Sequence, residues 1–231
     1  MTGVSYTILS RMYARRRACD TNTMFGLTRE EERILRKLNT PAKIQDFLDS
    51  LPMNHEKRGE TYLSPRRVLR EKKAHCLEGA LLAAAALWIR GQEPLLMDFR
   101  TLPKDEDHVV ALYRINGYWG AISKTNHAIL RFRDPIYRTP RELAVSYFNE
   151  YYMFETGEKT LREYSTPFNL KRLGTTWITA EEDLLEIAEA VDDARHFPLV
   201  PKKNLKHLRR ADSMEIRAGR LIEWKPSDRR T

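Results

Sequence analysis

The sequence predicts an α+β protein in which one apolar helix packs against an antiparallel sheet, with further helices on its flanks. Residues 76–89 are almost continuously apolar and rich in Ala and Leu, which is typical of a helix buried on all sides. Residues 107–123 contain two strand-like segments joined by Asn116-Gly117, a strong hairpin signal. Helix-start signals occur both before and after these segments. This order of helices, strands and helices predicts an α+β fold.

Length and composition set the domain organisation. The chain has 231 residues, of which 42% are hydrophobic and 31% charged, and this composition excludes an intrinsically disordered protein. We expect a single α+β domain over residues 25–200. A basic N-terminal arm over residues 1–24 and a basic C-terminal tail over residues 201–231 flank it.

Several classes of protein are excluded by what the sequence lacks. Its two cysteines, Cys19 and Cys76, cannot form a disulfide scaffold or a four-cysteine zinc site. The longest apolar run, residues 80–89, is about half of the ~20 residues that a membrane span needs. No secretory signal precedes the first arginines. We therefore expect a cytoplasmic protein that does not enter membranes and that needs no metal or cofactor.

Helix starts can be placed from capping signals. Thr28 with Glu31 fits a capping box, and Thr40-Pro41, Ser64-Pro65 and Thr139-Pro140 each place proline at the first helical position. Thr179 with Glu182 fits a further capping box and predicts an acidic helix that continues to Ala190.

The strands are predicted from apolar segments bounded by turn residues. Residues 94–99 fit a short buried strand, and residues 107–115 and 118–123 fit a hairpin. Residues 128–133 alternate in polarity and predict a third antiparallel strand, which Asp134-Pro135 should end.

Cys76 is the first candidate for chemistry. It stands at the start of the central helix, where unpaired backbone N–H groups and the helix dipole favour a thiolate. The alternative is a small cysteine that fills a gap in the core. His75 should point about 100° away from Cys76 on a helix and either have a structural role or face solvent, and Glu78 should interact with the helix dipole.

His108 is the second candidate. It opens a strand after the polar residues 103–107, and a histidine at a sheet edge can act as the base for a nearby thiol. The alternative is a surface histidine held by Asp105 or Asp107. A cysteine at a helix start followed by a histidine at a strand start is more specific than either residue alone.

These motifs resemble the transglutaminase-like superfamily, whose core is papain-like. The similar segments lie within residues 64–135: Lys73-Ala-His-Cys76, Asp107-His108-Val-Val, and Gly117-Tyr-Trp119 through Ser123. The resemblance implies a cysteine nucleophile at Cys76 and a catalytic histidine at His108.

The third residue of the family's triad departs from the pattern. The family typically has an aspartate four residues after the tryptophan, where this chain has Ser123. Serine can accept a hydrogen bond from the imidazole but supplies no charge. Asn126 and Asp134 are the other candidates for orienting His108.

The resemblance implies a cysteine hydrolase or acyltransferase that acts on an amide of a peptide, protein or small molecule. Two alternatives stay open. A non-catalytic binding module would explain the missing aspartate. A nucleic-acid-binding protein would explain the basic clusters at Arg15–Arg17, at residues 66–73 and from Lys202 onward, although solvated helix faces explain them more simply. The sequence does not indicate an oligomeric state.

Overall fold

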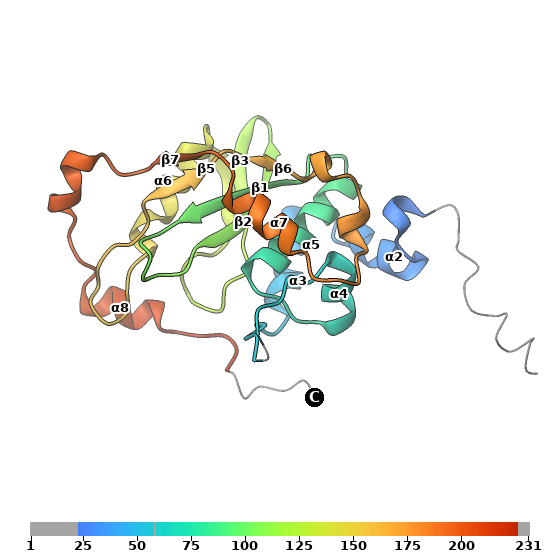
Figure 1. Ribbon diagram of the computed structural model, residues 1–231, viewed down its shortest axis with the longest axis horizontal. Coiled ribbons are helices and arrows are strands. Elements are labelled where there is room, and N and C mark those ends of the chain that lie inside the picture. Colours follow the sequence, from blue (N-terminus) through green and yellow to red (C-terminus); the bar gives the residue numbers. More distant parts are fainter. Residues whose placement is uncertain (1–22, 58, 226–231) are drawn as a thin grey trace, which may run out of the picture.

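The computed structural model describes residues 23–57 and 59–225. Four helices precede the sheet and gather at one end of the molecule (Figure 1): α2 (Arg29–Lys37), α3 (Pro41–Asp49), α4 (Pro65–Glu71) and α5 (Cys76–Ile89). The first three begin where the capping signals predict, because the side chains of Thr28, Thr40 and Ser64 each accept a backbone N–H of the first turn. Most of the expected N-terminal arm, including Cys19, lies outside the described residues.

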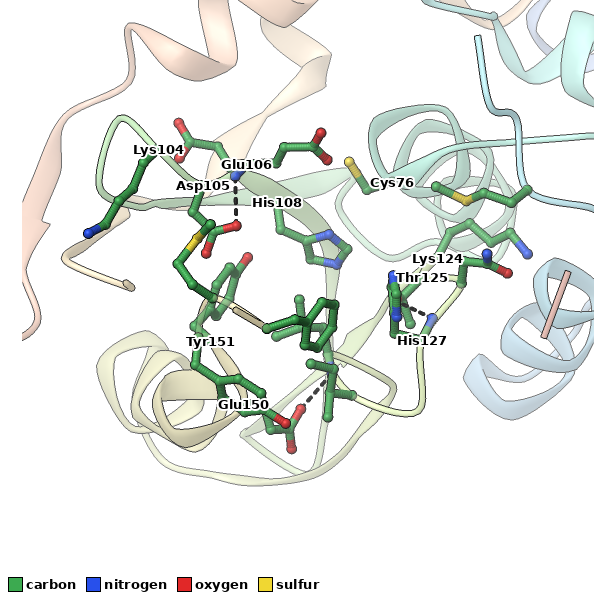
Figure 2. Close-up of a pocket in the computed structure, with 18 of the residues that line it drawn as sticks. Cys76, Lys104, Asp105, Glu106, His108, Lys124, Thr125, His127, Glu150 and Tyr151 are labelled. Atoms are coloured by element: carbon green, nitrogen blue, oxygen red, sulfur yellow. Dashed lines mark hydrogen bonds between the residues drawn. The ribbon is translucent and has the colours of Figure 1, made fainter. Parts of the chain in front are cut away.

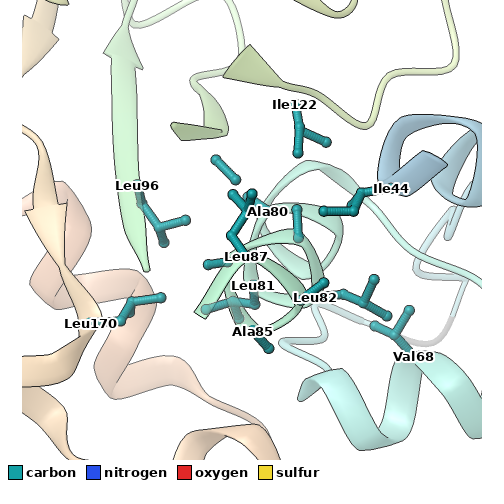
Figure 3. Close-up of a cluster of buried hydrophobic side chains, with 14 of the residues drawn as sticks. Ile44, Val68, Ala80, Leu81, Leu82, Ala85, Leu87, Leu96, Ile122 and Leu170 are labelled. Carbon is teal, nitrogen blue, oxygen red and sulfur yellow. The ribbon is translucent and has the colours of Figure 1, made fainter. Parts of the chain in front are cut away.

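Helix α5 forms the centre of the larger hydrophobic core. Leu81, Leu82 and the four alanines at 83–86 have no exposed surface, and side chains from α3, α4 and the sheet surround them (Figure 3). Burying each leucine contributes about 1.5–3 kcal/mol relative to leaving it exposed. Since the helix is enclosed, its first residue has a fixed position relative to the sheet.

The sheet has seven strands, and every pairing in it is antiparallel. Its strand order is β4-β3-β2-β1-β5-β7, and the short β6 also pairs with β1. The strands are β1 (Leu95–Arg100), β2 (His108–Ile115), β3 (Tyr118–Ile122), β4 (Arg133–Tyr137), β5 (Glu163–Ser165), β6 (Phe168–Asn169) and β7 (His196–Pro198). Asn116 and Gly117 make the predicted β2–β3 turn with positive φ angles of 51° and 86°.

Alternate residues of β2 face opposite layers of the molecule. Val109, Ala111 and Tyr113 belong to the core around α5, whereas Val110 and Leu112 pack with α6 (Pro140–Tyr147) on the other face. The sheet is therefore covered by α5 on one side and by α6 on the other (Figure 1). This architecture confirms the predicted α+β class and the antiparallel sheet.

The predicted third strand at residues 128–133 is wrong. Leu130 has a φ of 61°, which a strand does not allow, and the strand that pairs with β3 is β4, at Arg133–Tyr137. This strand contains Asp134 and Pro135, the pair that was expected to end it. Proline is tolerated because β4 lies at the edge of the sheet, where one side of the strand has no partner to receive an N–H group.

The predicted capping box at Thr179 is also wrong. The helix α7 covers only Leu185–Asp192, and residues 179–183 are used instead to hold α4. Backbone oxygens of Thr179 and Ala180 accept hydrogen bonds from Arg66 and Ser64, and Asp183 pairs with Arg67. Tertiary contacts therefore outweigh the local helix signal.

The remaining elements precede the strands, connect them or follow them. They are the 3₁₀ helices η1 (Met24–Gly26), η2 (Phe148–Glu150), η3 (Leu170–Leu173), η4 (Thr176–Ile178) and η5 (Lys202–His207), and the helix α8 (Ser213–Gly219). Residues 201–225, most of the expected basic tail, thus contain two helical segments. Ile222 forms an antiparallel bridge with His127, close to the pocket described next.

Candidate active site

The structure places Cys76 at the first residue of α5, with His75 at the N-cap. The residue is partly exposed and lines a pocket of about 520 Å³ (Figure 2). Backbone N–H groups in the first helical turn have no intrahelical partner, and together with the helix dipole they favour a negative charge on the sulfur. The position therefore has the electrostatic character that the sequence predicts.

Two imidazoles act on the Cys76 thiol. Burial alone would raise the pKa of Cys76, but hydrogen bonds and charge from His108 and His75 outweigh it and hold the pKa well below the ordinary value. His75 Nδ1 lies 3.9 Å from the sulfur. His108, the first residue of β2, projects into the same pocket as Cys76 (Figure 2). The lowered pKa favours the thiolate, the form in which a cysteine can act as a nucleophile.

The hydrogen bonds of Ser123 show which ring nitrogen of His108 donates a hydrogen to it and which does not. The Nε2 atom lies 2.8 Å from Ser123 Oγ, and that hydroxyl donates its one hydrogen to the Leu130 carbonyl at 2.5 Å. Ser123 Oγ must therefore accept a hydrogen from Nε2. Nδ1 is therefore the ring nitrogen of His108 that Ser123 leaves available, and His108 hydrogen-bonds the thiol of Cys76.

Ser123 is itself held by the core. Gln45 of α3 accepts from the Ser123 backbone N–H at 2.9 Å and donates to its carbonyl at 2.8 Å. A Cβ on Gly79 of α5 would come within 2.5 Å of Lys124 Cβ, so only glycine lets the helix lie this close to the segment. An aspartate at position 123 would bring a carboxylate against the Leu130 carbonyl, whereas serine donates to it. The local backbone thus suits serine.

The other two candidates for orienting His108 do not do so: Asn126 bonds a different segment, and Asp134 is exposed on another strand. The Asn126 side chain donates to the carbonyl of Trp224 and accepts from its N–H, each at 2.8 Å. It therefore ties down the C-terminal segment. Asp134 is exposed on the edge strand β4. Of the candidates, Ser123 is the one whose side chain bonds the imidazole.

His75 differs from its expected orientation. As the N-cap it has an extended backbone (φ −97°, ψ −172°), so the 100° helical spacing does not apply to it. Its Nε2 donates to the Thr61 carbonyl at 2.8 Å, which turns Nδ1 toward Cys76. Burial lowers the pKa of His75, but the hydrogen bond and charge of Cys76 and the charge of Glu78 outweigh it and raise the pKa to about 9. His75 thus adds a positive charge beside the thiol.

Glu78 holds the start of α5 in place. Its carboxylate has no exposed surface and accepts hydrogen bonds from the His75 N–H, the Leu63 N–H and the side chains of Asn54 and Thr61. Each of these contacts joins the 54–63 loop or the N-cap to the first turn of the helix. Glu78 is therefore a structural anchor for Cys76 and His75.

Tyr151 is a pocket residue that the sequence analysis missed. Its hydroxyl is buried and has no hydrogen-bond partner, although the residue lines the same pocket as Cys76 and His108. Burial raises the pKa of Tyr151 well above its ordinary value, and the charge of Cys76 adds to this effect. The hydroxyl therefore stays protonated as a donor, and Figure 2 shows it pointing toward the interior of the pocket. The sequence around Tyr151 offers only an aromatic helix face, which gives no sign of this role.

Metal-ligand side chains come together at one place in the described part of the chain. Asp98, Asp107 and Asp192 bring carboxylate oxygens within 4.8 Å of one another. These aspartates already have partners, since Asp98 bonds His196, Asp107 accepts from Thr101 and Asp192 pairs with Arg100. The three carboxylates that could bind a metal ion are therefore already used in contacts within the protein.

Neither a known protein-family model nor a curated protein matches the chain. Among the described residues, no helix has both the length and the apolar character to cross a bilayer.

Proposed function

We propose that this protein is a cysteine-dependent amide hydrolase or acyltransferase with a transglutaminase-like core. One observation carries the proposal: Cys76 lies at a helix start beside His108, and the His108 ring is fixed by Ser123. The antiparallel sheet packed against α5 is compatible with that core. The motifs that resemble the superfamily supply the chemical class.

The reaction would begin with attack of the Cys76 thiolate on the carbonyl carbon of an amide. The oxygen then gains a negative charge, which the backbone N–H of Cys76 and the Tyr151 hydroxyl would stabilise. The His108 imidazolium gives its Nδ1 proton to the leaving nitrogen, the C–N bond breaks, and a thioester with Cys76 remains. Water or an amine then attacks the thioester while His108 accepts its proton, and the thiolate is released.

The nucleic-acid alternative has less support. On α4, Arg66 pairs with Glu31, Arg67 with Asp183 and Arg70 with Glu181. Cations that already have acidic partners in the protein are less available to phosphates. Arg15–Arg17 lie outside the described residues. In the cluster from Lys202 onward, Arg209 pairs with Asp212, whereas Lys202, Lys203 and Lys206 are exposed.

Formation of an acyl-enzyme tests the proposal. We expect 4-nitrophenyl acetate to release a burst of one nitrophenolate per chain and to leave one acetyl group on the Cys76 peptide, measured by rapid kinetics and mass spectrometry. Cys76→Ser should abolish the burst, whereas Cys19→Ser should keep it. Acetylation confined to lysines, or a burst that survives Cys76→Ser, would contradict the enzyme reading and favour the binding module.

A further inference from the structure

The pocket has a charge opposite to that of the whole chain. The protein carries a formal net charge of +8, yet the pocket is lined by more carboxylates than amines. The lining carboxylates are Asp105, Glu106, Asp107, Glu150 and Glu155, and the lining amines are Lys104 and Lys124. Because a cleft with low-dielectric walls concentrates the field of its lining charges, this local excess affects what enters.

Among the described residues, neither lysine forms an ion pair with a carboxylate of the pocket lining. Lys104 is paired with Glu158 at 2.5 Å, and Lys124 is fully buried with its Nζ donating to the Leu51 carbonyl. Glu150 is neutralised by Arg133. Asp105 and Glu106 lie on the loop that leads into β2, beside His108 (Figure 2).

Within the described residues, four of the five lining carboxylates have no ion-pair partner: Asp105, which is partly buried, and the exposed Glu106, Asp107 and Glu155. Asp107 accepts hydrogen bonds only from Thr101. We call Glu106, Asp107 and Glu155 the acidic rim.

A second observation indicates that the pocket is built to receive a ligand. The buried Tyr151 hydroxyl has no protein partner and points into the pocket, so it needs a polar atom from outside the chain. A ligand that contacts Tyr151 and Cys76 occupies the pocket that the acidic rim also lines.

We propose that the pocket selects acyl substrates that carry a positive charge next to the reacting carbonyl, such as amides of basic peptides or of amine-bearing small molecules. This inference rests on the proposed function, because it assigns the substrate class of the same site. The carbonyl binds between Cys76 and Tyr151, and the cationic group binds at the acidic rim.

Thiol reagents that differ in charge test this selection. In a Cys19→Ser background, Cys76 is treated with methanethiosulfonates that carry a trimethylammonium group, a sulfonate group or only a methyl group. The ratio of the cationic to the anionic rate is divided by the same ratio measured with free 2-mercaptoethanol, because a thiolate in water already favours the cationic reagent. We expect this normalised ratio to be about 10 to 100, in line with the focusing of charge in clefts. This ratio should fall toward one at high salt.

Matched variants localise the effect. Glu106→Gln/Asp107→Asn/Glu155→Gln should bring the ratio close to one. Glu106→Gln/Glu155→Gln, which leaves the Asp107–Thr101 contacts next to His108 intact, should move it in the same direction. Glu181→Gln/Glu182→Gln/Glu186→Gln changes the net charge equally outside the pocket lining and should keep the wild-type ratio.

The reagents separate the two proposals. A wild-type ratio near one with rapid reaction of the neutral reagent at about pH 6 would overturn the substrate class alone, because an ordinary thiol is almost fully protonated at that pH. Slow reaction of the neutral reagent would instead contradict the activated thiolate on which the proposed function depends. The inference would also be overturned if Glu181→Gln/Glu182→Gln/Glu186→Gln lowered the ratio as much as the variants of the acidic rim do.

Discussion

Tyr151→Phe is expected to slow acylation of Cys76 by about 100-fold without lowering the stability of the protein. The hydroxyl is the one side-chain donor that we assign to the developing oxyanion, and losing one such donor costs about 10²–10³ in rate. Because the hydroxyl is buried without a partner, its removal leaves no protein group unsatisfied. The burst rate with 4-nitrophenyl acetate and urea unfolding measure the two effects.

Tyr147→Phe is the matched control. Tyr147 is also fully buried, but its hydroxyl donates to the Arg131 carbonyl at 2.9 Å and the residue does not line the pocket. We expect this variant to lose about 1–3 kcal/mol of unfolding free energy and to acylate at nearly the wild-type rate. Equal loss of acylation in both variants, or no loss in Tyr151→Phe, would remove Tyr151 from the mechanism.

His108→Gln is expected to have two large effects. It removes the hydrogen bond that does most to lower the pKa of Cys76, while the burial that raises this pKa remains, so the pKa should rise. At about pH 6 a thiol with a pKa near 8.5 is roughly 300-fold less ionised than a full thiolate. A low-pKa thiolate is intrinsically less nucleophilic, so alkylation by iodoacetamide should fall by between about 10- and 300-fold.

The second effect appears at about pH 9, where the thiol of His108→Gln is ionised again. The variant should then form the acetyl-enzyme but fail to hydrolyse it, because no base activates water. Loss of a general base costs about 10²–10⁴ in rate. Retention of the acetyl group on Cys76, followed by mass spectrometry over time, measures this block.

His75→Gln separates charge stabilisation from proton transfer. Its loss should also raise the pKa of Cys76, but His75 does not line the pocket and its Nε2 is bound to Thr61. We expect slower alkylation at about pH 6 and normal release of the acetyl group at about pH 9, where His75 is near its own pKa of about 9 in the wild type. Identical behaviour of the two histidine variants would contradict the assignment of His108 as the base.

Elements with strong local signals were predictable from the sequence. The caps at Thr28, Thr40, Ser64 and Thr139 each accept a backbone N–H where their patterns indicate. Alanine and leucine content defined the central helix, and Asn-Gly defined the hairpin. These features depend on residues that are neighbours in the sequence, so they can be recognised without knowledge of the fold.

The errors occurred where distant contacts decide the structure. Thr179 bonds α4, and Asp183 bonds both α4 and the loop before it. Because of these contacts, the two residues do not join the helix that their own sequence predicts. Pro135 is compatible with a strand only because β4 is an edge, and edge position is a property of the whole sheet.

The residues of the candidate site also divide into those that local sequence signals identify and those whose roles depend on distant contacts. Cys76, His108 and Ser123 could be selected because each stands at a recognisable start or end of an element. Gln45 and Tyr151 could not be selected from the sequence, because each lies on or next to an apolar helix face. Gln45 acquires its role only when α3 packs against Ser123, and Tyr151 only when the end of η2 reaches the pocket. The acidic rim was also hidden, since its members come from two loops about fifty residues apart.

Direct titration of Cys76 tests the central claim, that two imidazoles make this thiol a thiolate at neutral pH. The ultraviolet absorbance of the thiolate in the Cys19→Ser protein is followed against pH, with Cys19→Ser/Cys76→Ser as the blank. As the pH falls, the thiolate should persist far below the ordinary thiol pKa of about 8.5 and be lost only at the depressed pKa of Cys76. A single transition at or above about pH 8.5 would contradict the account.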